Sequence, residues 1–237
     1  MSFALDFPVA AEAGVDERSA FVRRAYGHFA AALLVFGVIE LVLFQLDLAR
    51  PMTEGMFAGG RLVMIGIIVA FMAVGTLARW WAHHSASLAM QYLGLALYVF
   101  AQALICVPML TLAVYFTGDR TILPKAGVMA GAVMVGLTAA AFSIRPERLH
   151  RGPLAALATA LCIGAGLAGY WYGFNLALGV CVLFVVLASG YVVYDVSTIV
   201  HQYRTDQHVG AALKLFADVA LLFLLLIYLL WSVSNQE

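Results

Sequence analysis

Charged residues are scarce in this sequence. Asp, Glu, Lys and Arg make up only 11% of the 237 residues, and 13 basic residues balance 13 acidic ones. A chain without excess positive charge has no general electrostatic attraction to nucleic acid, so we expect no nucleic-acid partner. With 64% hydrophobic residues and a mean hydropathy of +0.97, the composition excludes an ordinary soluble domain and indicates a protein of the lipid bilayer.

Cysteine is also rare. Cys106, Cys162 and Cys181 lie in apolar segments and form no CxxC or Cys/His spacing, so we expect no disulfide, zinc site or cofactor. The first 21 residues lack the basic start and apolar run of a signal peptide. We therefore expect residues 1–25 to form a short cytosolic leader and residues 26–237 to form one transmembrane domain.

Long apolar runs dominate the rest of the chain. Seven of them are long enough to cross a hydrocarbon core of about 30 Å. They predict an all-α, polytopic membrane protein with seven transmembrane helices. The runs cover residues 26–46, 62–80, 88–116, 123–142 and 153–172, followed by a pair within residues 176–233. Pro108 lies inside the third run, where we expect a kink.

The basic residues predict the orientation of these helices. If odd-numbered helices start in the cytosol, nine Lys and Arg residues lie inside and four lie outside. This places the N-terminus and the turn between the last two helices in the cytosol, and the C-terminus outside. Five histidines also fall near the cytosolic boundary, where they could be solvated or could tune a pH response: His28, His83, His84, His201 and His208.

The last two apolar runs each contain one aspartate, Asp195 and Asp218. If the helices end near His201 and begin near Ala211, each aspartate is six or seven residues from the turn, roughly 10 Å into the membrane. A charge inside a bilayer costs roughly 2.5 kcal/mol or more unless it finds a partner, water or a proton, which favours a functional role. The alternative is a structural polar contact, such as an i, i+4 ion pair between Lys214 and Asp218.

Other polar residues are candidates for accessory roles. Tyr191, Asp195 and Thr198 continue to Gln202 as one polar stripe on an otherwise apolar helix. Arg79 closes the second span, where it either extends to the headgroups or pairs with one of the aspartates. Glu40, in the outer half of the first span, either lines a path or reaches the outer interface.

The motif GYVVYDVSTIVHQY, followed by VGAALKLFADVALLFLLLIYLL, resembles the end of the Bax inhibitor-1 family of membrane proteins. The stretches FVRRAYGHFAAALLVFG and ALICVPMLTLAVYF are similar to that family's first and third helices. The resemblance implies seven helices with the seventh near the centre, and a pH-sensitive calcium leak channel in a bacterial inner membrane. By this resemblance, the aspartyl pair of the family corresponds to Asp195 and Asp218. The arginine that ends the family's second helix corresponds to Arg79.

The sequence departs from the family pattern in two places. The glycine usual before the third-helix proline is replaced within the ALIC run, and the end of the fourth helix reads Ser143-Ile144-Arg145-Pro146. These departures concern conduction more than the fold.

Two carboxylates at one depth suggest a specific chemistry. They cannot both be ionised cheaply in a site of low dielectric constant, so we expect them to share one proton and sense pH. Once that proton leaves, their oxygens can bind calcium, which takes about six to eight oxygen ligands. Tyr191, Thr198 and water supply only some of the remainder, so the binding is expected to be weak, as passage requires.

Two alternatives use the same residues differently. An intramembrane aspartyl protease also needs two aspartates on adjacent helices, but its second one is expected after Gly-x-Gly, and here the sequence is Leu215-Phe216-Ala217-Asp218. We therefore expect the protein not to be an enzyme. The other alternative is a non-conducting membrane regulator that binds a membrane protease or a stress-response partner.

Overall fold

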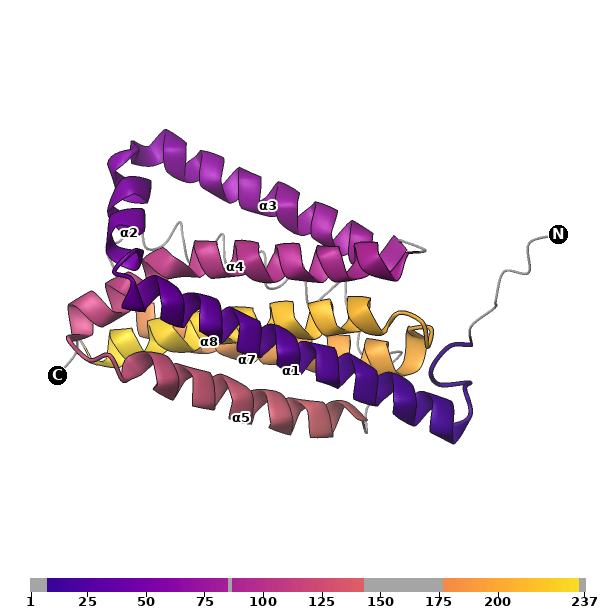
Figure 1. The fold of residues 1–237 in the computed structure, drawn as a ribbon. Coiled ribbons are helices and arrows are strands. Elements are labelled where there is room, and N and C mark those ends of the chain that lie inside the picture. Colours follow the sequence, from indigo (N-terminus) through magenta and orange to yellow (C-terminus); the bar gives the residue numbers. More distant parts are fainter. Residues whose placement is uncertain (1–7, 85–86, 143–176, 235–237) are drawn as a thin grey trace. The chain divides into compact units, whose positions relative to one another are not determined.

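The computed structural model describes residues 8–84, 87–142 and 177–234 (Figure 1). Apart from one isolated β-bridge between Val9 and Arg204, all regular structure in these residues is helical, which confirms the all-α prediction. The helices are α1 (Val15–Gln45), α2 (Ala49–Ala58), α3 (Gly60–His84), α4 (Leu88–Thr117), α5 (Ile122–Phe142), α7 (Ala177–Gln202) and α8 (His208–Ser234).

Six of these helices are long and apolar enough to cross a membrane, namely α1, α3, α4, α5, α7 and α8. They coincide with six of the seven predicted spans and confirm a polytopic membrane protein. The remaining predicted span, residues 153–172, lies outside the described residues, so the count of seven stays a prediction. Helix α4 continues through Pro108 without interruption.

Helix α1 begins earlier than the sequence analysis predicts. Its first residue is Val15, so its first turns fall within residues 1–25, which we expected to be a leader. Asp16 and Glu17 lie in the first turn, where negative charge stabilises the positive end of the helix dipole. Phe21 and Ala25 are buried, so tertiary packing holds this part of the helix as well.

Helix α2 was not predicted, because its ten residues span only about 15 Å and are too short to cross a bilayer. It buries Ala49 and Thr53, which are one turn apart on the same face. On its exposed side, Arg50 Nε lies 2.8 Å from Glu54 Oε1. Gly60, with a φ of 70°, then allows the chain to turn into α3.

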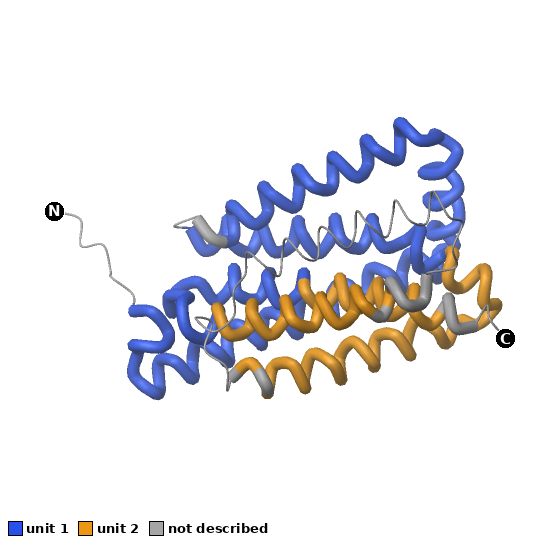
Figure 2. Tube along the Cα trace, turned by 180° about the vertical axis from the view of Figure 1, so that it is seen from behind, with its two compact units in different colours: residues 1–111, 199–217 blue, residues 112–198, 218–237 orange. Residues whose placement is uncertain are grey.

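The chain forms two compact units (Figure 2). Unit 1 comprises residues 1–111 and 199–217, and unit 2 comprises residues 112–198 and 218–237. Helices α4, α7 and α8 therefore each contribute one part to each unit. The prediction of a single domain over residues 26–237 stays a prediction.

In unit 1, α8 packs against α1 and α4 through aromatic side chains. The Phe216 ring is fully buried, and its centroid lies 5.8 Å from that of Phe36 and 6.1 Å from that of Tyr98. Helices α3 and α4 approach closely at Gly94, because a Cβ atom there would lie 2.6 Å from the carbonyl oxygen of Ala78. A side chain at Gly94 would thus push the two helices apart.

In unit 2, α8 contacts α5 and α7. The Cys181 thiol donates a hydrogen bond to the carbonyl oxygen of Leu225, at 3.4 Å. Gly127 of α5 lies next to Phe223 of α8, because a Cβ atom at this glycine would be 4.0 Å from the phenylalanine ring. Each unit thus contains a part of α8 that is packed against two other helices.

Candidate functional site

The two aspartates occupy neighbouring helices of unit 2. Asp195 of α7 is only 6% exposed, and Asp218 of α8 is half-buried. One oxygen of each carboxylate, Oδ1 of Asp195 and Oδ2 of Asp218, is inaccessible to solvent. Helices α7 and α8 contact each other in this unit, but a direct contact between the two carboxylates stays a prediction.

The helix ends place one of the two aspartates farther from the turn than the sequence analysis predicts. Helix α7 ends at Gln202, seven residues after Asp195, close to the prediction. Helix α8 begins at His208 instead of near Ala211, so Asp218 is ten residues from its start. These separations correspond to about 10 Å and about 15 Å along the two helices. The early start of α8 is stabilised by tertiary packing, because residues 208–213 are all buried.

The predicted polar stripe lies on α7. Tyr191 is half-buried, Thr198 is buried and Gln202 is exposed at the end of the helix. The Thr198 hydroxyl donates a hydrogen bond to the carbonyl oxygen of Tyr194, one turn earlier, at 2.8 Å. Its proton is therefore used within the helix, while the oxygen lone pairs can still accept a hydrogen bond or contact a cation.

Arg79 is exposed near the end of α3, as expected for an interfacial residue. Its guanidinium carbon lies 5.8 Å from the centroid of the Tyr98 ring, within the range of a cation–π interaction. This contact with α4 was not part of either predicted role. Arg79 belongs to unit 1, so its pairing with Asp195 or Asp218 stays a prediction.

Lys214 and His201 also belong to unit 1. The ammonium nitrogen of Lys214 lies 5.7 Å from the centroid of the Tyr203 ring, which joins the first part of α8 to the turn before it. His201 is half-buried in the last turn of α7. The side chains of both residues are thus close to the turn between α7 and α8.

Whether Glu40 lines a path or reaches the outer interface stays a prediction. Its side chain is buried in α1, and the residue is 8% exposed. Within the described part of the chain, neither carboxylate oxygen has a hydrogen-bond partner, and both are inaccessible to solvent.

Sequence reasoning missed a contact between the N-terminal segment and the turn that joins α7 and α8. The amide of Ala10 donates a hydrogen bond to the Tyr203 carbonyl oxygen at 2.8 Å, and the Thr205 amide donates to the Pro8 carbonyl oxygen at 3.1 Å. The Thr205 hydroxyl also donates to Glu17 Oε1 at 2.8 Å. We call residues 8–10 and 203–205 the N-terminal clasp. Three residues that pair with a distant turn leave no periodic signal in the sequence.

The structure brings together two of the five boundary histidines. The imidazole centroids of His28 and His208 are 5.3 Å apart. His28 also hydrogen-bonds the Tyr92 hydroxyl through Nε2 at 2.8 Å, and its Nδ1 lies 2.6 Å from the Arg24 carbonyl oxygen. The side chains of His83 and His84 lie outside the described residues. The cluster connects α1, α4 and α8 beside the N-terminal clasp.

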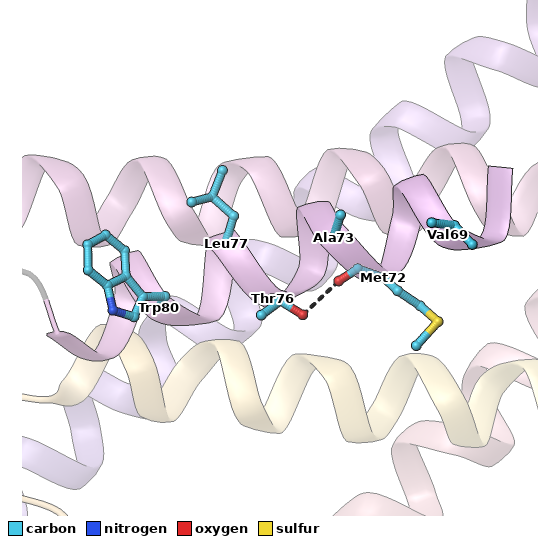
Figure 3. A pocket seen from close by; sticks show the side chains of 6 residues that line it. All are labelled: Val69, Met72, Ala73, Thr76, Leu77 and Trp80. Atoms are coloured by element: carbon cyan, nitrogen blue, oxygen red, sulfur yellow. Dashed lines mark hydrogen bonds between the residues drawn. The ribbon is translucent and has the colours of Figure 1, made fainter. Parts of the chain in front are cut away.

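A shallow apolar depression on α3 contrasts with these polar contacts (Figure 3). The Thr76 hydroxyl is its main polar group, and it donates a hydrogen bond to the Met72 carbonyl oxygen at 2.8 Å. Because this hydroxyl is satisfied within its own helix, the surface suits lipid chains. The depression is lined by Val69, Met72, Ala73, Thr76, Leu77 and Trp80.

Known proteins resemble the chain over most of its length. Protein lifeguard 4 of Mus musculus is 26% identical over 228 residues, which cover 95% of this chain and 90% of that protein. An uncharacterised protein of Neisseria meningitidis serogroup A is 28% identical over 149 residues, covering 60% of this chain and 63% of that protein. The family model for inhibitors of apoptosis-promoting Bax1 matches residues 18–235. With its apolar helices and this match, the chain is an integral membrane protein that belongs to the Bax inhibitor-1 family.

Proposed function

We propose that this protein is a pH-sensitive leak channel for cations, with calcium as the transported ion and Asp195 and Asp218 as its gate. The observation that carries the proposal is the burial of Asp195 in a membrane helix of the same compact unit that holds Asp218. A carboxylate in this position costs free energy unless it has a partner, a proton or an ion. Binding of a transported cation would offset that cost. Family membership supports a channel-like or regulatory role in a membrane.

Protonation of the pair is the proposed gating step. With one shared proton, the carboxylates attract each other through a hydrogen bond and keep α7 and α8 together. Loss of that proton leaves two negative charges that repel each other and attract a divalent cation. The pair therefore couples the cytosolic pH to both the separation of the helices and the affinity for the ion.

Weak binding is part of this proposal. Two carboxylates with Tyr191, Thr198 and water give calcium an incomplete set of oxygen ligands, and an ion that binds weakly can also leave. The lone pairs of the Thr198 oxygen support this role, because its proton is already used within α7. We assign Arg79 as the cation that competes with calcium for Asp195.

The proposed channel has seven membrane crossings. The N-terminal clasp joins the start of α1 to the turn after α7, so an even number of crossings separates these two points. Helices α1, α3, α4, α5 and α7 account for five. The predicted span at residues 153–172, outside the described residues, is the proposed sixth, and α8 is the seventh.

We propose a central position for α8, and its neighbours within each unit support this proposal. It packs against α1 and α4 in unit 1, and against α5 and α7 in unit 2. We place the N-terminus and the clasp in the cytosol and the C-terminus outside a bacterial inner membrane, because basic residues are concentrated on the clasp side.

Calcium flux into liposomes tests the function. The wild-type protein is reconstituted, and flux is measured from about pH 5 to about pH 9, the range in which a carboxyl pair with one shared proton titrates. We expect Asp195→Asn and Asp218→Asn each to flatten the pH dependence, because a single carboxyl cannot share a proton with an amide. Asp119→Asn is the matched control, since Asp119 is an exposed loop residue. A pH dependence that persists in both site variants contradicts the gate.

The family description favours a second function, that of a non-conducting regulator. The description names inhibition of apoptosis-promoting Bax1, which is a regulatory activity and not transport. A wild-type protein that shows no calcium flux at any pH, yet co-purifies with a membrane protein partner, supports this alternative over the channel.

A further inference from the structure

Glu40 is a buried acid that the proposed gate does not use. It lies in α1 of unit 1, whereas both aspartates of the gate belong to unit 2. Its two carboxylate oxygens are inaccessible to solvent and accept no hydrogen bond from the residues that the structure describes. Such a group is unusual, because buried polar atoms in native proteins nearly always have a partner.

Glu40 interacts with a thiol of α4. The residue is Cys106, which is fully buried and interacts electrostatically with Glu40. The Gln102 side chain is also buried and donates a hydrogen bond from Nε2 to Cys106 Sγ, at 3.3 Å. A thiol does not neutralise a carboxylate.

Three kinds of partner can make a buried carboxylate acceptable, namely a basic side chain, a metal ion or a proton. Glu40 has no basic side chain within ion-pair distance in the described residues. The same residues contain no cluster of three or more His, Cys, Asp or Glu side chains that could hold a metal ion. Calcium takes about six to eight oxygen ligands, far more than one carboxylate supplies.

We propose that Glu40 is a proton-binding site in the membrane-embedded part of α1, separate from the aspartyl pair. The carboxyl group holds its proton while α1 and α4 exclude water from it, and it releases the proton when water reaches it. The site therefore makes any movement that hydrates the α1–α4 contact dependent on pH. This inference stands independently of calcium transport.

Infrared spectroscopy of the full-length protein in lipid vesicles tests the site directly. Protonated and ionised carboxyl groups absorb at different frequencies. At neutral pH, we expect Glu40→Gln to remove one protonated-carboxyl absorption and to leave the carboxylate absorption unchanged. Glu54→Gln is the matched control, because Glu54 is exposed and paired with Arg50, so this change removes carboxylate absorption only. Loss of carboxylate absorption in Glu40→Gln overturns the proposal.

A measurement on the wild-type protein covers the case in which Glu40→Gln does not fold. The chain has six glutamates, so carbon-13 labelling of their carboxyl groups gives a spectrum with few resonances. We expect one glutamate resonance to stay at the protonated position through neutral pH while the others are ionised. A spectrum in which all six glutamates are ionised at neutral pH overturns the proposal. If the protein shows no calcium flux, neither the infrared result nor the glutamate resonances change. That outcome contradicts the proposed channel and not the proton-binding site.

Discussion

Helices α3 and α8 are both apolar and long enough to cross a membrane, but they are used differently. In the most apolar part of each helix, 44% of the residues are buried in α8 and only 11% in α3. Helix α8 contains Lys214 and Asp218 between its ends and packs against helices in both units. Helix α3 has its basic residues, Arg61 and Arg79, near its ends, and the hydroxyl of Thr76 is satisfied within the helix.

This comparison shows that hydrophobicity identifies a membrane helix without identifying its surroundings. Lipid chains and a protein interior are both apolar, so either accepts leucine, valine and phenylalanine. Polar residues are more informative, because lipid offers them no partner. A polar group satisfied within its own helix can face lipid, whereas Asp218 needs the rest of the protein, a proton or an ion.

The largest effect is expected from removing packing around α8. Leu215 is fully buried in α8, whereas Leu77 of α3 is 41% exposed to the surroundings. We expect Leu215→Ala to destabilise the folded protein by about 2 to 4 kcal/mol, because the cavity loses its dispersion contacts. Leu77→Ala should cost well under half of that, since lipid chains can fill the space. Unfolding of both variants in lipid micelles by a denaturing detergent measures this difference in the free energy of unfolding. Equal losses of stability in the two variants would mean that α3 is as tightly packed as α8.

A smaller effect is expected from the two threonines that donate hydrogen bonds in these regions. Thr205 precedes α8 and bonds Glu17 at 2.8 Å, whereas Thr76 bonds the carbonyl oxygen of Met72 within α3. Thr205→Val should destabilise the protein by about 1 kcal/mol and leave Glu17 without this donor, while Thr76→Val should be nearly neutral. Faster hydrogen exchange at the Thr205 amide in the first variant would report loosening of the N-terminal clasp. Unchanged exchange would show that the backbone bonds alone hold the clasp.

The smallest effect on stability is expected from a change in the loop between α4 and α5. There the surroundings are water and not lipid or protein. The Thr121 hydroxyl and amide each donate to the Asp119 carboxylate at 2.7 Å, and Lys125 lies 3.0 Å away. These contacts, led by the hydroxyl, lower the pKa of Asp119 from 3.8 to about 2. Because the folded state favours the ionised form, the stabilisation is complete above the unfolded pKa and disappears as the pH falls from about 4 to about 2.

Thermal unfolding at acidic pH measures this contribution. As the pH falls from about 4 to about 2, the midpoint temperature of unfolding should fall slightly more for the wild type than for Asp119→Asn. The variant has no carboxylate charge to lose at this position. Because Asp119 lies in a loop and its side chain is 44% exposed, the difference should be small beside that of Leu215→Ala. Identical acid profiles would mean that the Thr121 and Lys125 contacts do not persist in solution.

Much of the fold could be predicted from hydrophobic runs. The spans at 62–80, 88–116 and 123–142 fall within α3, α4 and α5, because a membrane requires a minimum number of consecutive apolar residues. Helix α2 and the first turns of α1 escaped this criterion, since they depend on burial against other helices. The sequence also led to Asp195 and Asp218, because charge inside a membrane segment stands out in any position.

The depths and contacts of the site residues were less predictable. The start of α8 was misplaced by three residues, because residues 208–210 directly follow a polar turn in the sequence but are buried in the structure. The contact of Arg79 with Tyr98 depends on how closely α3 and α4 approach at Gly94. Neither feature has a local pattern, because each depends on residues from another element.

The sequence by itself determined that this chain is a helical membrane protein of the Bax inhibitor-1 family, with two acidic residues in its last two helices. Apolar runs and charges are local properties, and a bilayer selects for them directly. Only the tertiary structure decided that Glu40 is buried without a hydrogen-bond partner among the described residues, that the N-terminal segment binds the turn before α8, and that α3 is exposed while α8 is packed. Burial depends on which helices meet, and that is decided by contacts between residues far apart in the chain.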